Sequence, residues 1–269
     1  METVLVWLLP LVLAYLIGSL PLGAWLVRAA SGFDPRDVNP HLLGVENVYK
    51  LVGPVVAVSS FVLDILKGLV AVMVPVLITS WSIGLAPLTL DPFAGVALSL
   101  PGGFTGFFGA AANAPVQLGT AAGMAFFGVI LGHLNPLPLK GLVSVPRGRG
   151  NGVVVGALAA LFGLGVVPFW LGALAVAVYA AVLALTGYVA LASVAGIVTL
   201  AFAGVMAAQA QGVSDGLAVG FVAAAAILTW RHKAALGRIN DGTEARLGAP
   251  PPCAAWTPTR CCAPSWFTP

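Results

Sequence analysis

The chain has 269 residues, of which 59% are hydrophobic and 8% are charged. Soluble domains carry about 25% charged residues, so this composition excludes an ordinary soluble enzyme. Abundant Leu, Val and Ala accompany the 33 glycines and 20 prolines, which excludes a disordered or collagen-like chain. A spanning helix needs about 20 apolar residues, and the chain has room for several. The composition therefore predicts an all-α, polytopic membrane protein.

The first apolar segment runs from about Val4 to Val27 and ends at Arg28. The only charged residue before it is Glu2. Because a cleaved signal peptide begins with a basic region, we expect this segment to be retained as the first span. A polar stretch, residues 31–50, follows it.

The middle of the chain predicts two further spans. Leu51 to about Ile78 and Gln117 to Leu134 are both predominantly apolar. Between them, residues 81–115 are rich in Gly, Pro and Ala. That stretch is ambiguous, and an interfacial or a re-entrant segment would both fit its composition.

The C-terminal half contains a long stretch, residues 152–230, whose single charge is Asp215. Breaks at Pro168, Thr186-Gly187 and Gln209–Ser214 divide it into four spans. We therefore expect about seven spans within a transmembrane domain of residues 1–248. Five spans would also place the two termini on opposite sides of the membrane. The Pro-rich tail, residues 249–269, is expected to be disordered, and its three cysteines imply no disulfide framework.

Basic residues gather in three segments, and the loops that alternate with them carry no Lys or Arg. The three groups are Arg28, Arg36 and Lys50 after the first span, Lys140, Arg147 and Arg149 after the third, and Arg231, Lys233, Arg238, Arg246 and Arg260 after the last. The positive-inside rule then predicts that all three segments are cytoplasmic, with the N-terminus outside and the C-terminus inside.

Two charged residues, Asp64 and Lys67, lie within the second predicted span. Their i,i+3 spacing puts them on one helix face, where they can partly neutralise each other. Charges inside a span are costly and usually face the protein interior or a water-filled cavity. The pair is therefore either a functional site or a structural ion pair near a helix end.

The segment Arg147–Gly152 alternates arginine with glycine before an apolar helix. Glycine lets the backbone approach a ligand closely, and N–H groups at a helix start favour an anion. Arginine adds a planar, bidentate phosphate donor. A phosphate site and a flexible basic loop that touches lipid headgroups both fit this pattern.

Two of the three histidines, His41 and His133, lie before the C-terminal basic segment, and their surroundings give little indication of function. His41 and Glu46 have the spacing of the His-x4-Asp pair of soluble-headed acyltransferases, but the acid is Glu and no partner motif follows, so we interpret the pair as incidental. His133, at a predicted helix end, is compatible with a structural role at headgroup level. No Walker loop, zinc pattern or Gly-x-Ser-x-Gly elbow occurs in the sequence.

Six segments between about Leu13 and Gly248 carry further patterns in order. They are Ala14–Gly23 (A-Y-L-I-G-S-L-P-L-G); Asp34-Pro35-Arg36 followed by Gly44, Asn47 and Lys50; Asp64-Ile65-Leu66-Lys67-Gly68; Leu131-Gly132-His133 followed by Pro136; Arg149-Gly150 followed by Gly156; and Arg231-His232 followed by Arg238, Gly242-Thr243-Glu244 and Arg246. Together they resemble the bacterial membrane-integral glycerol-3-phosphate acyltransferases that use acyl phosphate as donor.

This resemblance implies a transfer of an acyl group from acyl phosphate to sn-glycerol 3-phosphate on the cytoplasmic side of the bacterial inner membrane. It assigns phosphate contacts to Lys50, Lys67 and Arg149, and positioning of the acceptor to Asn47, His232 and Glu244. Further binding residues would be Arg36, Gly44, Gly148, Gly150, Arg238 and His133. The expected partners are the two substrates and membrane lipids. We expect no cofactor, metal, nucleic acid or obligate protein partner.

Four departures from the family's motifs motivate an alternative. Pro40 stands where the family has a serine, Lys50 replaces an arginine, Arg149 replaces a lysine, and Ala235 replaces an asparagine. The cation exchanges keep charge but change donor geometry. Pro40 and Ala235 remove hydrogen-bonding side chains outright, so a repurposed, non-catalytic relative that binds lipid or a partner stays open. A transporter is less favoured, because only the second span holds buried ionisable groups.

Overall fold

The computed structural model describes residues 2–32, 48–49, 52–82, 116–136, 150–164, 166–167, 169–211, 214–244 and 246–247. Over these ranges the regular structure is entirely helical, which confirms the all-α prediction. The helices are α1 (Glu2–Gly18), α2 (Leu22–Ser31), α5 (Pro54–Ser82), α7 (Val116–Leu134), α8 (Asn151–Gly163), α9 (Phe169–Thr186), α10 (Val189–Gln211) and α11 (Asp215–Asn240).

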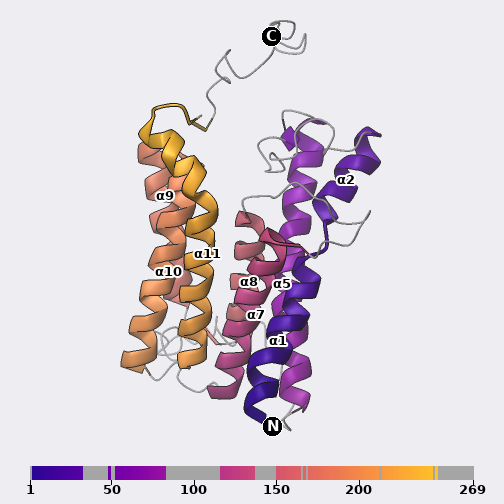
Figure 1. The fold of residues 1–269 in the computed structure, drawn as a ribbon, viewed down its shortest axis with the longest axis vertical. Coiled ribbons are helices and arrows are strands. Elements are labelled where there is room, and N and C mark those ends of the chain that lie inside the picture. Colours follow the sequence, from indigo (N-terminus) through magenta and orange to yellow (C-terminus); the bar gives the residue numbers. More distant parts are fainter. Residues whose placement is uncertain are drawn as a thin grey trace, which may run out of the picture.

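The first predicted span is not one continuous helix. It is interrupted between α1 and α2 at Ser19–Pro21, and α2 runs in a different direction from α1 (Figure 1). Pro21 lacks a backbone N–H and disfavours a helical conformation at Leu20, so the break is local in origin. The apolar run from Val4 to Ser31 hid it, because hydropathy alone does not register a single proline.

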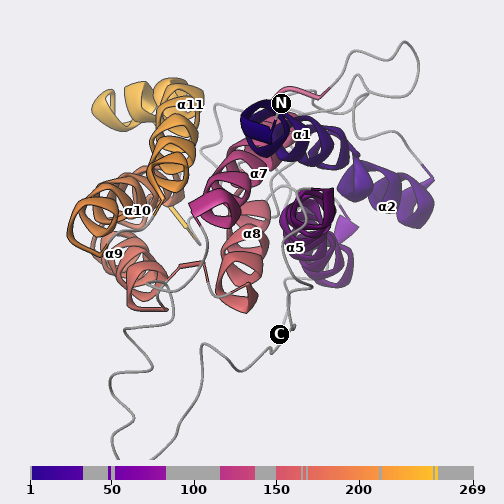
Figure 2. The same cartoon turned by 90° about the horizontal axis from the view of Figure 1, so that it is seen from below.

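The helices form two groups whose main contact is between α7 and α11. α1, α2, α5, α7 and α8 pack together, and α9, α10 and α11 pack beside them; α7 and α11 join the groups (Figure 2). α7 lies in the middle and is the most deeply buried apolar helix. It carries two of the largest buried side chains, Phe126 and Ile130, and the Phe126 ring meets Phe221 of α11 edge-on at 5.0 Å.

Glycines let the central helices approach closely. A Cβ placed on Gly156 of α8 would overlap the carbonyl oxygen of Ile65 in α5, and one on Gly132 of α7 would overlap that of Tyr15 in α1. Small residues at such contacts are the usual means by which membrane helices pack tightly. The same close approach fixes α8 against α5 and α7 against α1, and these helices carry the site described below.

Among the described residues, five helical segments are long and apolar enough to cross a membrane: Val4–Ser31, Pro54–Ser82, Val116–Leu134, Phe169–Thr186 and Val189–Met206; α8 is apolar but shorter. The helix ends at Gly163, Thr186 and Gln211 agree with the three predicted breaks in the C-terminal half. The ambiguous stretch, from residue 83 to 115, and the tail, residues 249–269, lie outside the described residues.

Candidate functional site

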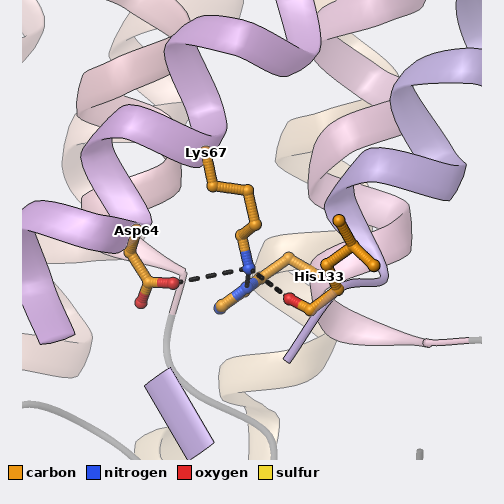
Figure 3. A network of polar contacts seen from close by, with 4 residues as sticks. Asp64, Lys67 and His133 are labelled. Atoms are coloured by element: carbon orange, nitrogen blue, oxygen red, sulfur yellow. Dashed lines mark hydrogen bonds and ion pairs between the residues drawn. The ribbon is translucent and has the colours of Figure 1, made fainter. Parts of the chain in front are cut away.

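Lys67 is the centre of a buried polar cluster in the membrane-spanning part of the bundle. Its side chain is 3% exposed, and its Nζ lies 3.4 Å from Asp64 Oδ1 on the preceding turn of α5. The ammonium also lies 2.9 Å from His133 Nδ1 and donates to the carbonyl oxygen of Leu20 at 3.2 Å (Figure 3). The predicted ion pair is therefore real, and it includes a histidine from another helix.

The cluster forms where helix ends meet. Leu20 lies just beyond the end of α1, and its carbonyl oxygen accepts from Lys67 instead of from the helix. His133 occupies the last turn of α7, and the Tyr15 hydroxyl of α1 donates to Asn135 O at 3.0 Å. Carbonyl ends of helices carry partial negative charge, so a lysine between two of them is favourably placed.

The start of α8 faces the same cluster. Gly150, the residue before α8, has φ of +82°, a left-handed conformation that favours glycine. A Cβ placed on it would lie 3.5 Å from His133 Cδ2 and 3.8 Å from Leu228 Cδ2 of α11. A Cβ on Gly152 would lie 2.9 Å from Asp64 Cβ. The N-terminus of α8 is thus enclosed by α5, α7 and α11, and such a terminus attracts anions.

A side-chain contact also links this terminus to α10. Ser193 Oγ lies 3.0 Å from Asn151 Oδ1, the first residue of α8. Ser193 also bonds the carbonyl oxygen of Val189 at 2.7 Å. Neither residue was singled out from the sequence, because an Asn and a Ser that are 42 residues apart form no recognisable motif.

His232 lies on α11, one turn after Leu228. It is 4% exposed, and its Nδ1 lies 2.8 Å from the Leu228 carbonyl oxygen. That oxygen can only accept, so Nδ1 carries the hydrogen. Because Leu228 also lies near Gly150, His232 is positioned about one turn from the start of α8. Ala235 is buried three residues further along α11.

Arg238 and Glu244 bind each other. Arg238 Nε donates to Glu244 Oε2 at 2.6 Å, with the arginine side chain 50% exposed and the glutamate 7% exposed. The backbone N–H groups of Thr243 and Glu244 donate to the Arg238 carbonyl oxygen. These bonds fold the chain back after α11 ends. Two residues after Glu244, the guanidinium carbon of Arg246 lies 5.4 Å from the centroid of the Tyr188 ring.

The structure therefore brings together Lys67, His133 and Gly150, with His232 nearby, and separately pairs Arg238 with Glu244. The other predicted site residues lie outside the described residues: Arg36, Gly44, Asn47, Lys50, Gly148 and Arg149, as do Pro40 and the incidental pair His41 and Glu46. Within the described ranges, His, Cys, Asp and Glu residues form no group of three that could hold a metal ion.

The fold and the cluster define an integral membrane helix bundle with a buried cationic site at the meeting point of helix ends. The glycerol-3-phosphate acyltransferase family model matches residues 8–242. The glycerol-3-phosphate acyltransferase of Thermosynechococcus vestitus is 31% identical over 252 residues, which are 93% of this chain and 99% of that protein. That of Rhodopseudomonas palustris (strain HaA2) is 29% identical over 249 residues, or 90% and 96% of the two chains.

A solved structure has the same fold. It is the crystal structure of PlsY (YgiH), an integral membrane glycerol 3-phosphate acyltransferase, in its glycerol 3-phosphate form. It superposes with a TM-score of 0.59 at 21% sequence identity and covers 89% of this chain and 94% of that one. From these matches, the chain belongs to the glycerol-3-phosphate acyltransferase family and is an acyltransferase.

Proposed function

We propose that this protein transfers a fatty acyl group from acyl phosphate to sn-glycerol 3-phosphate, giving 1-acylglycerol 3-phosphate and phosphate. The observation that carries the proposal is the buried Lys67 ammonium, which contacts Asp64 and His133, the two residues that lie beside the start of α8. Family membership supplies the acyl acceptor. PlsY has also been solved in a lysophosphatidic acid form, the class of product that the proposed reaction gives.

The chemistry needs little from the protein beyond position and charge. The acceptor hydroxyl attacks a carbonyl that phosphate already activates, the new ester C–O bond forms, and phosphate leaves. A protein accelerates such a step by holding two anions close and in line. A site made of cations, backbone amides and glycines satisfies that requirement without a covalent nucleophile.

We assign Lys50, Lys67 and Arg149 to the phosphates, and Asn47, His232 and Glu244 to the acceptor. Lys67 would attract the phosphate through its charge, because its N–H groups are directed to Asp64, His133 and Leu20 O. Its burial supports this assignment, and the place of His232 on α11 near the start of α8 supports that of His232. Glu244 contacts Arg238, so its contribution would be to position the chain that follows α11. Assignments on residues outside the described ranges rest on the motifs alone.

The identity of the acyl donor is tested by replacing acyl phosphate with acyl-CoA. Purified protein in lipid bilayers would receive labelled glycerol 3-phosphate with acyl phosphate, or with the acyl-CoA of the same chain. We expect labelled lysophosphatidate only with acyl phosphate, accompanied by an equal amount of inorganic phosphate. Equal or faster turnover with acyl-CoA would contradict the proposed donor.

We further propose seven crossings of the inner membrane, with the N-terminus outside and the site on the cytoplasmic side. α1 begins at one end of the bundle, whereas α2 and α11 end at the other (Figure 1). Arg28 lies in the last turn of α2 and Arg238 in that of α11, so basic residues share that end. α8 has 13 residues and is about 20 Å long, so its crossing would need flanking residues to reach both surfaces.

The topology predicts a specific reporter pattern. A reporter fused after Gly212 is expected to give an extracytoplasmic signal, and one fused after Gly248 a cytoplasmic signal, because Lys and Arg are retained on the cytoplasmic side. Alkaline phosphatase and a fluorescent protein, fused at each position, measure the two sides independently. The reverse pattern at both positions would contradict the orientation.

A second prediction concerns Arg149, which precedes the left-handed Gly150. If this arginine binds a substrate phosphate, Arg149→Ala removes a charge-assisted contact of about 1.5–3 kcal/mol, so activity should fall at least about 10-fold. Arg149→Lys should recover part of it, since lysine keeps the charge but not the planar fork. Wild-type activity in Arg149→Ala would leave only contact with lipid headgroups for this segment.

A further inference from the structure

We infer that His133 donates a hydrogen bond from its Nε2 to a substrate phosphate at the start of α8, and that Lys67 fixes the tautomer that makes this possible. The inference rests on the proposed function and deepens it. It names the donating atom and gives Lys67 a second role as a positioning residue.

The tautomer follows from the partner of Nδ1. Lys67 Nζ lies 2.9 Å from His133 Nδ1, and an ammonium has three donors and no acceptor. Its other two hydrogen-bond directions lead to Leu20 O and to Asp64 Oδ1, with which the ammonium forms an ion pair. Nδ1 must therefore accept, and the ring hydrogen is on Nε2.

Nε2 is a buried donor that needs a partner. Its exposed area is below 1 Å², and no hydrogen-bond partner for it is found within the described part of the chain. Leaving such a donor unpaired is costly. Structural histidines normally satisfy both ring nitrogens, whereas here one nitrogen is held by Lys67 and the other is left for something else.

The Cδ2–Nε2 edge of the ring faces the start of α8. Cδ2, which is bonded to Nε2, would lie 3.5 Å from a Cβ placed on Gly150. Because residue 150 is glycine, no side chain lies between this edge and the backbone at the start of α8, and the N-terminus of α8 supplies partial positive charge beside it. Two donors of independent origin, a helix terminus and an imidazole N–H, therefore converge on one place. A phosphate monoester is the anion that fits, because its oxygens accept several hydrogen bonds at once.

Substitution of His133 by Asn or by Gln distinguishes the roles of the two ring nitrogens. In His133→Asn the side-chain oxygen can take the place of Nδ1 and accept from Lys67, but nothing reaches the position of Nε2. In His133→Gln the amide N–H₂ reaches the Nε2 position and restores the donor there. A purely structural histidine would respond to both changes through stability alone, so KM is the informative readout.

We expect His133→Asn to raise KM for one phosphate substrate about 10-fold or more, as for a lost hydrogen bond to a charged group. His133→Gln should keep that KM within about threefold of wild type. Varying glycerol 3-phosphate at saturating acyl phosphate, and the reverse, shows which substrate's phosphate is bound. Unchanged KM values for both substrates in His133→Asn, or equal increases in the two variants, would overturn the inference.

Binding without turnover keeps this test separate from the proposed reaction. The thermal stabilisation of each variant by glycerol 3-phosphate, and by inorganic phosphate, is measured in detergent without a donor. Stabilisation that is lost in His133→Asn and retained in His133→Gln supports the assignment of Nε2 even if no acyl transfer is detected. Equal stabilisation of wild type and both variants by each anion, at the same half-maximal concentration, would contradict it.

Discussion

Lys67→Met is expected to reduce acyl transfer by about 10- to 150-fold and to destabilise the fold. Without Lys67, the His133 tautomer that donates to the phosphate is no longer fixed, and the loss of a hydrogen bond to a charged group costs about 1.5–3 kcal/mol, which sets the effect on rate. The Lys67 side chain is 3% exposed and faces Asp64, so its removal also leaves a carboxylate without its cation. Breaking a buried pair in this way costs about 3–5 kcal/mol. Initial rates and thermal unfolding in detergent measure the two effects separately.

The double variant Asp64→Asn/Lys67→Met separates catalysis from folding. It removes both charges, so most of the lost stability should return, because replacing a whole buried pair is often neutral. Activity should stay low if the Lys67 charge, and the His133 tautomer that it fixes, act on the substrate phosphate. A folded double variant with wild-type turnover would instead make the pair structural, which is the second of the two interpretations that the sequence left open.

Gly156→Ala is expected to lower stability by about 1–3 kcal/mol, the usual effect of overpacking a filled contact. A Cβ at this position would overlap the Ile65 carbonyl oxygen, so α8 must move away from α5. That movement also shifts Gly152 away from Asp64, and activity should fall with stability. Thermal unfolding and initial rates of the purified variant test both effects.

Gly163→Ala is the matched control on the same helix. Nothing lies within 4 Å of a Cβ placed there, and alanine is favoured over glycine in a helix by up to about 1 kcal/mol. The control should therefore be neutral or slightly stabilising. If the two variants had the same stability, the close approach of α5 and α8 would be wrong.

Secondary structure was largely predictable because the chain marks its breaks with Gly and Pro. The ends of α8, α9 and α10 follow from Pro168, Thr186-Gly187 and Gln209–Ser214. The break at Pro21 carried the same kind of signal, yet the uninterrupted apolar run around it was interpreted as one span. Hydropathy detects the length of a segment, not its continuity.

Contacts of the site that lie within one helix could be predicted from the sequence, whereas contacts between different helices could not. The i,i+3 spacing of Asp64 and Lys67 predicts their contact, and the structure has it. His133 is 66 residues from Lys67, so no helical periodicity connects them. The third partner of Lys67 is the Leu20 carbonyl oxygen, which is free because the helix breaks at Pro21. A backbone atom cannot be identified from a pattern of side chains.

The pairing of Arg238 with Glu244 shows a similar limit. Both were predicted from a C-terminal motif as separate contributors to binding and catalysis. They bind each other because α11 ends at Asn240 and the chain folds back over its last turn. The motif identifies the residues, whereas the turn that follows the helix determines which of them meet.

The most direct test is the rate at which purified protein in lipid bilayers converts acyl phosphate and labelled glycerol 3-phosphate into labelled lysophosphatidate. We predict a rate that saturates with glycerol 3-phosphate in the wild type and falls at least about 10-fold in Asp64→Asn/Lys67→Met. No product from a folded wild-type sample, with other phosphorylated acceptors also inert, would contradict an acyltransferase built around Lys67.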